Sequence, residues 1–279
     1  MTVNKATKIS DIFLSKEKEY YGEIKLGILT DSWDITGNIV KEEPIKSFSF
    51  KSISNIIKSF EGKYTQDIPA YSAKKKDGQP LYKYARKGQI FSEIKNDVFI
   101  YKARLLKAQK GSFAFKVKCS SGTYIRSIAN DICKRLITAG VLAKLVRVKI
   151  GKFSVKNSIE PEKILDIVTD IRSEFRNVNK EEIKKIPWLC EIKNLNIGFK
   201  NIKVKKNYYR QISEGHPLFA NMIDFGKTIK HEYNEKDLIK IKIFRENRIF
   251  LHKVLKDFNI EDLNVADKIK LTKFIIEIK

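Results

Sequence analysis

In the segment GSFAFKVKCSSGTYIRSIANDICKRL, residues 111–136, the spacing of apolar residues changes from that of a strand to that of a helix. Apolar and polar positions first alternate, so one face of a strand carries Phe113, Phe115, Val117 and Cys119, and the other carries Ala114, Lys116 and Lys118. Apolar residues then recur with the spacing of an amphipathic helix: Ile125, Ile128, Ala129, Ile132 and Leu136. The segment therefore predicts a strand followed by a helix, with Thr123 as the residue that caps the helix.

The sequence on the N-terminal side extends this pattern. Val98–Leu106 has the composition of a strand and precedes the turn Gln109-Lys110-Gly111, which predicts a hairpin with the strand that follows. Residues 20–29 predict another strand, and residues 52–60 have the spacing of a helix capped by Ser52.

Past residue 160 the character of the chain changes. Charged segments with helical spacing occupy residues 161–176 and 179–186, and short strands are predicted at Leu238–Phe244, Arg248–Val254 and Phe274–Ile278. We therefore expect an α+β protein. A body with a mixed or antiparallel sheet would occupy residues 1–190, and a linker with a small β-rich domain would occupy residues 191–279.

The charge of the chain indicates the kind of partner. Lys and Arg total 56 against 33 acidic residues, which gives a formal net charge of +23 over 279 residues. An excess of this size favours a polyanionic partner, with nucleic acid as the leading candidate. The alternative is compositional drift, because Lys, Ile and Asn are abundant throughout the sequence.

The chain offers little that resembles a metal site or a membrane segment. Its three cysteines and three histidines, which are Cys119, Cys133, Cys190, His216, His231 and His252, lack metal-ligand spacing. No apolar run approaches the length of a membrane span, and the N-terminus lacks the apolar core of a signal peptide. We expect a cytoplasmic protein without a metal.

Arg126 is an unusual residue for its position. A helix that starts at Thr123 places this arginine in the first turn, where the helix dipole disfavours a cation. A nearby carboxylate or phosphate would explain it, although a solvated surface arginine is equally possible.

Three other clusters could carry chemistry. Residues 66–78 form a loop that combines Tyr71 with three successive lysines, which suits a single-stranded or flipped nucleotide but also a plain lysine-rich turn. Residues 81–88 predict a short basic helix ended by a glycine. Asp31 and Asp34 could act as acid and base or bind a metal, but turn formation is the favoured interpretation.

Four groups of residues recur in the order and spacing of a known family. They are Lys18-Glu19-Tyr20 with Leu26-Gly27 and Thr30–Gly37; Gln66, Tyr71–Lys75, Gly78, Tyr82, Ala85-Arg86 and Gly88; Gly122–Arg126; and Leu145-Val146-Arg147 with Gly151-Lys152-Phe153. Together they resemble the bacterial tRNA pseudouridine-55 synthase family. The resemblance is continuous over about residues 4–155 and weaker to about residue 218.

The sequence departs from the family pattern in three places. Ser32 stands where the family has a second threonine, and Ile68 stands where it has the first of two prolines. In the family, a segment like Asn4–Lys8 follows a G-x-L-D-P motif that holds the catalytic aspartate. Since the sequence begins at Met1, we expect an N-terminally truncated member that lacks this aspartate.

The resemblance implies a mechanism and a site. Members break the glycosidic bond of the T-loop uridine of tRNA, rotate the base and rejoin it through carbon 5, using no cofactor. The base is flipped into the pocket. By matching position, Tyr20 would stack on the base, Tyr124 would contact it, Leu145 would line the apolar wall, and Arg126 would pair with the aspartate.

Contacts to the RNA backbone are expected outside the pocket. Our candidates for phosphate contacts are Lys74, Lys75, Lys76 and Arg86, and the C-terminal domain would extend the RNA-binding surface. We expect a monomer whose partner is the T arm of tRNA.

Three hypotheses follow from the sequence. The chain is part of an active tRNA pseudouridine synthase, or it is a non-catalytic protein that binds or refolds tRNA, or it is another basic RNA-binding protein. A replacement of the catalytic aspartate by Asp31 or Asp34 is disfavoured, because these residues match other positions of the family pattern.

Overall fold

A computed structural model describes residues 2, 4–89, 94–164, 200–224, 232–233, 238–243, 248–254, 258–259 and 272–278. The chain divides into two compact units: Ile12–Ser158, and Met1–Asp11 together with Ile159–Lys279. The predicted border at residue 190 and most of the predicted helical segments between 161 and 186 lie outside the described residues, so they stay predictions.

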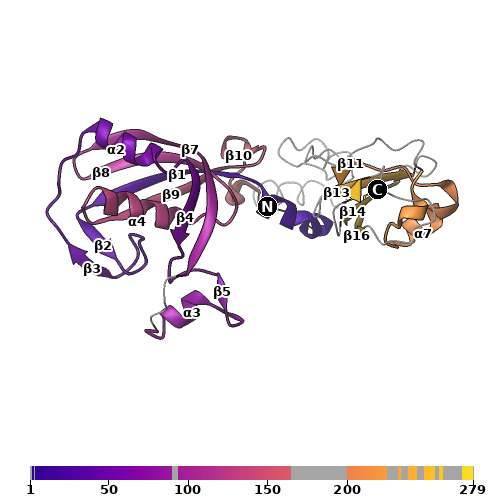
Figure 1. Ribbon diagram of the computed structural model, residues 1–279, viewed down its shortest axis with the longest axis horizontal. Helices are drawn as coiled ribbons and strands as arrows, with labels where there is room; N and C mark the ends of the chain where they lie inside the picture. The colour runs from indigo at the N-terminus through magenta and orange to yellow at the C-terminus, as the bar shows by residue number, and fades with distance from the viewer. Residues whose placement is uncertain are drawn as a thin grey trace. The chain divides into compact units, whose positions relative to one another are not determined.

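The unit Ile12–Ser158 is built on a six-stranded antiparallel sheet (Figure 1). Its strands, in spatial order, are β10 (Phe153–Ser154), β9 (Gly140–Ile150), β1 (Lys18–Leu26), β8 (Ser112–Cys119), β7 (Lys95–Gln109) and β4 (Gly62–Asp67). Two-stranded ribbons join β2 (Ile28–Thr30) to β3 (Ile39–Glu42) and β5 (Lys75–Lys76) to β6 (Gln79–Pro80). The predicted α+β class is confirmed, with an antiparallel sheet.

The hairpin of β7 and β8 forms where the sequence predicts it. Gln109 pairs with Ser112, and the turn between them holds Gly111 at a positive φ of 82°. Phe113, Phe115, Val117 and Cys119 are buried, as the alternation requires. Ala114, which we predicted on the opposite face with Lys116 and Lys118, is also buried at 6% exposure.

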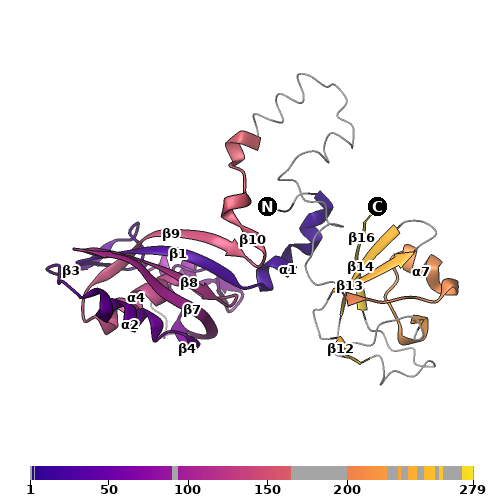
Figure 2. The ribbon, with the colours of Figure 1, turned by 90° about the horizontal axis from the view of Figure 1, so that it is seen from above.

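Helices α2 (Phe50–Lys58) and α4 (Ile125–Arg135) pack on one face of this sheet and share its core (Figure 2). The predicted helical stripe from Ile125 to Leu136 is buried throughout. The cap of α2 is Ser49, not Ser52, because the backbone N–H of Ser52 donates to the Ser49 Oγ at 3.1 Å. The cap position predicted from sequence is therefore three residues too late.

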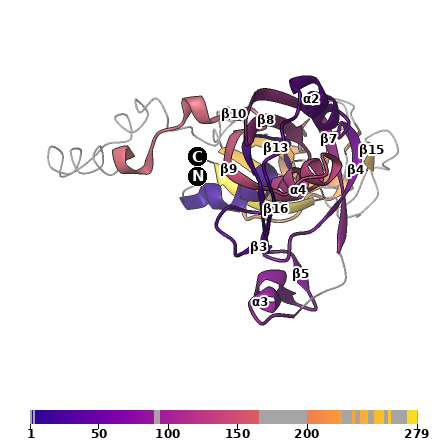
Figure 3. The same cartoon turned by 90° about the vertical axis from the view of Figure 1, so that its left-hand side faces the viewer.

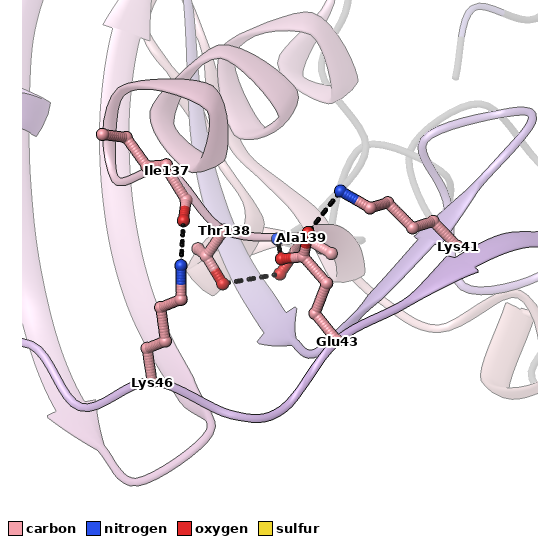
Figure 4. A network of polar contacts seen from close by, with 6 residues as sticks. All are labelled: Lys41, Glu43, Lys46, Ile137, Thr138 and Ala139. Carbon is pink, nitrogen blue, oxygen red and sulfur yellow. Dashed lines mark hydrogen bonds and ion pairs between the residues drawn. The ribbon is translucent and has the colours of Figure 1, made fainter.

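The segment after β3 is tied to the turn between α4 and β9 (Figure 4). The Glu43 carboxylate accepts a hydrogen bond from the Ala139 N–H at 2.8 Å and pairs with Lys41. The Lys46 Nζ donates to the Ile137 carbonyl at 2.8 Å, close to the end of α4 where a cation is favoured. These contacts, which we call the strap, hold an exposed segment to the turn that follows α4.

The second unit contains a four-stranded sheet in the order β11 (Lys200–Asn201), β13 (Leu238–Ile243), β14 (Arg248–Val254) and β16 (Thr272–Ile278). Its other elements are η1 (Asn4–Ile9), η4 (Lys206–Tyr208), α7 (Tyr209–Ser213), η5 (Ala220–Met222), and a ribbon of β12 (Glu232–Tyr233) and β15 (Phe258–Asn259). Its core includes Ile202, Ile212, Leu218 and Ile241. The predicted strands of the C-terminal domain are confirmed where the structure describes them.

Two further short elements flank the sheet of the first unit in sequence. They are α1 (Ser10–Ser15) and η2 (Val155–Asn157), whose first backbone N–H groups are partly satisfied by the Ser154 side chain. No helix within the described residues is long and apolar enough to cross a membrane.

Candidate functional site

A tight turn follows β2 and contains two carboxylates that line the same cavity. The Asp31 carboxylate accepts hydrogen bonds from the backbone N–H of Asn38 at 3.0 Å and from its side-chain amide at 3.1 Å. The Asp34 carboxylate accepts from the N–H and the hydroxyl of Thr36, at 3.1 and 2.8 Å. Both acids therefore hold the turn, which supports the turn-forming interpretation of this cluster.

Gly37 closes the same turn and leaves no room for a side chain. A Cβ built on this residue would lie 2.2 Å from the Ser32 Oγ and 2.7 Å from the Asp31 Oδ1. The turn also bonds to β9, because the Ile35 N–H donates to the Leu142 carbonyl at 3.0 Å. The position of the two acids is thus fixed by packing on both sides.

The start of α4 is held by a buried glutamine. Gln66, which is fully buried at the end of β4, accepts from the Tyr124 N–H at 3.1 Å and donates to the Gly122 carbonyl at 3.0 Å. The capping residue is Tyr124, not Thr123, since the Thr123 hydroxyl donates backwards to the Ser120 carbonyl at 2.9 Å. The side chain that satisfies the first turn of this helix comes from a strand 58 residues earlier in the sequence.

Arg126 lies in the first turn of α4, as predicted. Its guanidinium donates to the Ser32 carbonyl at 3.2 Å and to the Tyr71 carbonyl at 2.8 Å. Within the described residues its partners are therefore backbone oxygens, and the predicted direct partnership with an anion is not among these contacts. We call Gln66, Gly122, Tyr124 and Arg126 the α4 junction.

A polar cavity of about 380 Å³ opens beside Arg126. It is lined by Asp31, Ser32, Asp34, Thr36, Gly37, Asn38, Tyr71 and Arg126. The Tyr71 hydroxyl donates to the Asp31 carboxylate at 3.3 Å, so the loop that carries Tyr71 is joined to the turn. A cavity of this size, with one guanidinium and two carboxylates, suits a ligand with both hydrogen-bond donors and acceptors, such as a nucleobase.

Two more of the predicted substrate-binding residues lie on neighbouring strands. Tyr20 pairs with Arg147, and Gly22 pairs with Leu145, so all four residues share the face of the sheet that carries the core. Burial raises the pKa of the Tyr20 phenol, and Arg147 opposes part of this shift. Tyr20 is therefore a neutral, half-buried ring, while Leu145 is 45% exposed.

The four predicted substrate-binding residues are thus not gathered in one cavity. Arg126 lines the cavity of about 380 Å³. Tyr124, two residues earlier, is not a lining residue, and its backbone N–H donates to the Gln66 side chain. Tyr20 and Leu145 lie on β1 and β9 and are not among the lining residues.

The four predicted phosphate-contacting residues do share one substructure. Residues 72–88, which we call the arm, form the ribbon of β5 and β6 followed by α3 (Leu81–Ala85), and they project from the sheet of their unit (Figures 1 and 3). Lys74, Lys75 and Arg86 are exposed, Lys76 is half-buried, and the Arg86 guanidinium lies 5.5 Å from the centre of the Tyr82 ring. The predicted end of α3 is confirmed by Gly88, whose φ is 69°.

The arm is folded mainly by local backbone contacts. The Leu81 N–H donates to the Lys74 carbonyl at 2.8 Å, and the Tyr82 N–H donates to the Ser72 carbonyl at 3.1 Å. The turn at Asp77 and Gly78 has positive φ values of 50° and 79°, as a tight hairpin turn requires. The exposed cations are thus displayed on a small ordered scaffold.

Sequence reasoning missed the roles of Gln66 and Arg147. Both residues belong to the quoted family pattern, but only the fold shows that Gln66 caps α4 and that Arg147 neighbours Tyr20. A glutamine at the end of a predicted strand carries no local signal for a contact so far along the chain.

The described residues contain no group of three His, Cys, Asp or Glu side chains that could hold a metal ion. Burial raises the pKa of the Cys119 thiol to about 11 and that of Cys133 to about 12. Neither thiol is ionised near neutral pH, and Cys190 lies outside the described residues.

Comparison with known proteins bears directly on this site. The model of the TruB family pseudouridylate synthase N-terminal domain matches residues 1–125, which include the turn, the arm and the start of α4. A tRNA pseudouridine synthase B from Caldanaerobacter subterraneus is 33% identical over 250 residues, which cover 89% of this chain and 77% of the relative. The chain belongs to the TruB family of pseudouridine synthases.

Other TruB relatives are more similar over a shorter stretch. The tRNA pseudouridine synthase B of Thermosipho melanesiensis is 38% identical over 175 residues, which cover 61% of this chain. The chain spans 57%, 55% and 54% of the length of this and two further curated relatives, or little more than half.

A solved structure supports the fold. The chain matches one in the crystal structure of a Cbf5-Nop10-Gar1 complex with a TM-score of 0.67 and 16% identity, covering 98% of this chain and 71% of that one. At this identity the likeness concerns the fold alone.

Proposed function

We propose that this TruB family protein is a tRNA pseudouridine synthase that isomerises the T-loop uridine, position 55. The observation that carries the proposal is the cavity beside Arg126. All of its lining residues except Asn38 belong to the family pattern, and the chain matches a tRNA pseudouridine synthase B over most of its length. The reaction breaks the bond between the ribose and nitrogen 1 and forms a bond to carbon 5, whose hydrogen is released.

The site residues have complementary roles in this proposal. Tyr20 provides a neutral ring for stacking on a flipped uracil, and Leu145 provides an exposed apolar side chain on the adjacent strand. Tyr124 contacts the base from the start of α4. Arg126 pairs with the catalytic carboxylate of the family, because its guanidinium lines a cavity that a polar group can enter.

The arm supplies backbone contacts to the T arm of tRNA. Lys74, Lys75, Lys76 and Arg86 lie in the arm, in or directly beside its ribbon and helix, so their charges can meet neighbouring phosphates of a folded RNA. Phosphate contacts of this kind position the substrate without reading its sequence. No cofactor enters the mechanism, and we propose a cytoplasmic monomer.

One observation favours a second candidate function. The guanidinium of Arg126 is bonded to the carbonyls of Ser32 and Tyr71, and the carboxylates of Asp31 and Asp34 are engaged by the donors of their own turn. A protein with this arrangement could bind and refold tRNA without catalysing the isomerisation.

Tritium release distinguishes the two functions. The chain is incubated with a T-arm RNA whose uridines carry tritium on carbon 5, and binding of the same RNA is measured in parallel. Release at an enzymatic rate supports the synthase, and binding without release supports the non-catalytic protein. Neither binding nor release from a folded sample contradicts both.

Variants then test which carboxylate takes part. Asp31→Asn and Asp34→Asn each keep a hydrogen-bond acceptor for the turn but remove the charge. If release persists in both variants at an unchanged rate, neither acid is the nucleophile. The control is Asp11→Asn, which makes the same change in charge at an exposed residue outside both the cavity and the arm.

A further inference from the structure

A second concave surface lies on the other face of the six-stranded sheet. It is a hollow of about 150 Å³, lined by Glu19, Lys102, Arg104, Lys116 and Lys118. Because Phe115 and Val117 point into the core beneath α2 and α4, the alternating Lys116 and Lys118 point to the opposite face. We call this surface the basic hollow, and the cavity beside Arg126 is not part of it.

The strands in the basic hollow place like charges opposite each other. In the pairing of β7 with β8, Lys102 faces Lys118 and Arg104 faces Lys116. Like charges in directly opposed positions destabilise a sheet, whereas opposite charges stabilise it. Two such pairs in successive positions indicate a surface shaped by something other than the stability of the free protein.

Carboxylates compensate only half of this charge. Glu19 pairs with Lys116 at 2.7 Å, and Glu17 pairs with Lys118 at 2.8 Å. Lys102 and Arg104 are exposed and have no carboxylate partner within the described part of the chain. The ammonium group of Lys102 and the guanidinium group of Arg104 are therefore available to an external anion.

Exposed aromatic rings lie beside these cations. Phe99 and Tyr101 on β7 are 42% and 48% exposed, and their ring centres are 5.1 Å apart. The Lys118 Nζ lies 5.6 Å from the centre of the Tyr101 ring, so the rings adjoin the basic hollow. Cations that meet phosphates beside rings that stack on bases are the usual means of binding single-stranded nucleic acid on a sheet surface.

We propose that the basic hollow is a second RNA-binding surface, which takes the phosphodiester backbone of an unpaired RNA segment. The proposal rests on the proposed function in that RNA is the partner, but it involves neither the arm nor the cavity. The aromatic pair favours RNA over an acidic protein segment or an anionic membrane, because bases offer flat rings for stacking next to their phosphates.

Charge reversal provides a test with an unusual signature. In the double variant Lys102→Glu/Arg104→Glu, each like-charge pair across β7 and β8 becomes an opposite-charge pair. We expect the denaturation midpoint in urea to stay level or rise, while the affinity for an unmodified tRNA transcript falls about tenfold or more. The slope of log K against log salt concentration should become shallower by about 1 to 2.

The matched control is Lys51→Glu/Lys152→Glu, which makes the same change in net charge at two exposed lysines outside the hollow. A control that weakens binding as much as the hollow variant overturns the proposal, because net charge alone then explains the effect. Phe99→Ala/Tyr101→Ala should lower affinity without changing the salt slope, since it removes stacking and not charge.

The outcomes separate this proposal from the proposed function. If the wild-type chain binds the transcript and the hollow variant binds equally well, the proposal of a second RNA-binding surface is wrong and the proposed function stands. If the wild-type chain does not bind the transcript, both fail. Polyglutamate and phosphatidylcholine vesicles with phosphatidylserine are measured in the same way, and binding of either as tight as that of RNA, lost in the hollow variant, overturns the assignment to RNA.

Discussion

The α4 junction and the arm are both parts of the candidate site, but they are built in opposite ways. At the junction, the fully buried Gln66 satisfies backbone groups of Gly122 and Tyr124, and Arg126 bonds two carbonyls from distant segments. In the arm, hydrogen bonds join residues within ten positions of each other, and the side chains of Lys74, Lys75 and Arg86 are exposed.

The two regions therefore contribute different properties to the site: the α4 junction fixes the position of a side chain, and the arm provides positive charge. A buried polar group that loses its partner costs free energy, so the junction fixes the direction of Arg126. Exposed cations contribute little to folding and can be replaced without disturbing the structure. We therefore expect changes at the junction to act on stability and changes in the arm to act on RNA affinity.

The largest expected effect is that of Gln66→Leu. It removes the acceptor for the Tyr124 N–H and a donor to the Gly122 carbonyl, and should lower the free energy of unfolding by about 3 kcal/mol. Gln79→Leu, the same change at an exposed position of the arm, should cost less than about 0.5 kcal/mol. Urea denaturation followed by Trp33 fluorescence in a Trp188→Phe background measures both, and equal losses would remove the contrast.

Gly37→Ala should destabilise the turn by about 2 kcal/mol, because its Cβ would lie 2.2 Å from the Ser32 Oγ. Its counterpart in the arm is Gly78→Ala, where nothing lies within 4 Å of the new Cβ and only the positive φ of 79° opposes the change. That cost is about 1 kcal/mol. The same denaturation assay compares them, and a larger loss at Gly78 would show that packing does not determine the turn.

The triple variant Lys74→Ala/Lys75→Ala/Arg86→Ala should weaken binding of a tRNA transcript at least about tenfold, or about 1.4 kcal/mol. The free energy of unfolding should change by less than about 0.5 kcal/mol, since all three side chains are exposed. Filter binding at several salt concentrations measures the effect. Substitution of Lys51, Lys58 and Lys152 by Ala is the control, and an equal loss there would mean that the arm has no special role.

The smallest effect concerns the strap and its dependence on pH. The side chain of Lys41 and the N–H of Ala139 lower the pKa of the Glu43 carboxyl. A carboxyl whose pKa is lower in the folded state contributes stability above its ordinary pKa, and this contribution is lost as the pH falls through the folded value. Between about pH 5 and pH 3 the free energy of unfolding should fall further in the wild type than in Glu43→Gln. The control is Glu42→Gln, which should reduce this fall by less than Glu43→Gln does. Parallel curves for wild type and Glu43→Gln would contradict this account.

Much of the fold could be predicted because it depends on local periodicity. The alternation from Phe113 to Cys119 and the stripe from Ile125 to Leu136 each bury one face, and both lie where they were expected. The caps were less predictable. Ser52 and Thr123 are good capping residues, but the backbone enters α2 and α4 at Ser49 and Tyr124.

The candidate site was predicted in its residues more than in its geometry. Arg126 in the first turn of a helix and the cations of the arm follow from sequence patterns. The structure places Arg126 on α4, and the cations in or directly beside one ribbon and its helix. The grouping of Arg126 with Asp31, Asp34 and Tyr71 around a cavity was not predicted, because these residues are separated by up to 95 positions.

The sequence by itself determined the class of the fold, the excess of positive charge and the family pattern, because each is written in neighbouring residues or in composition. Only the tertiary structure decided that Gln66 caps α4, that Arg126 bonds the carbonyls of Ser32 and Tyr71, and that Lys102 and Arg104 face two further cations on the neighbouring strand. The reason is physical: strand register and helix packing bring together residues that are distant along the chain, and no local pattern records which partners will meet.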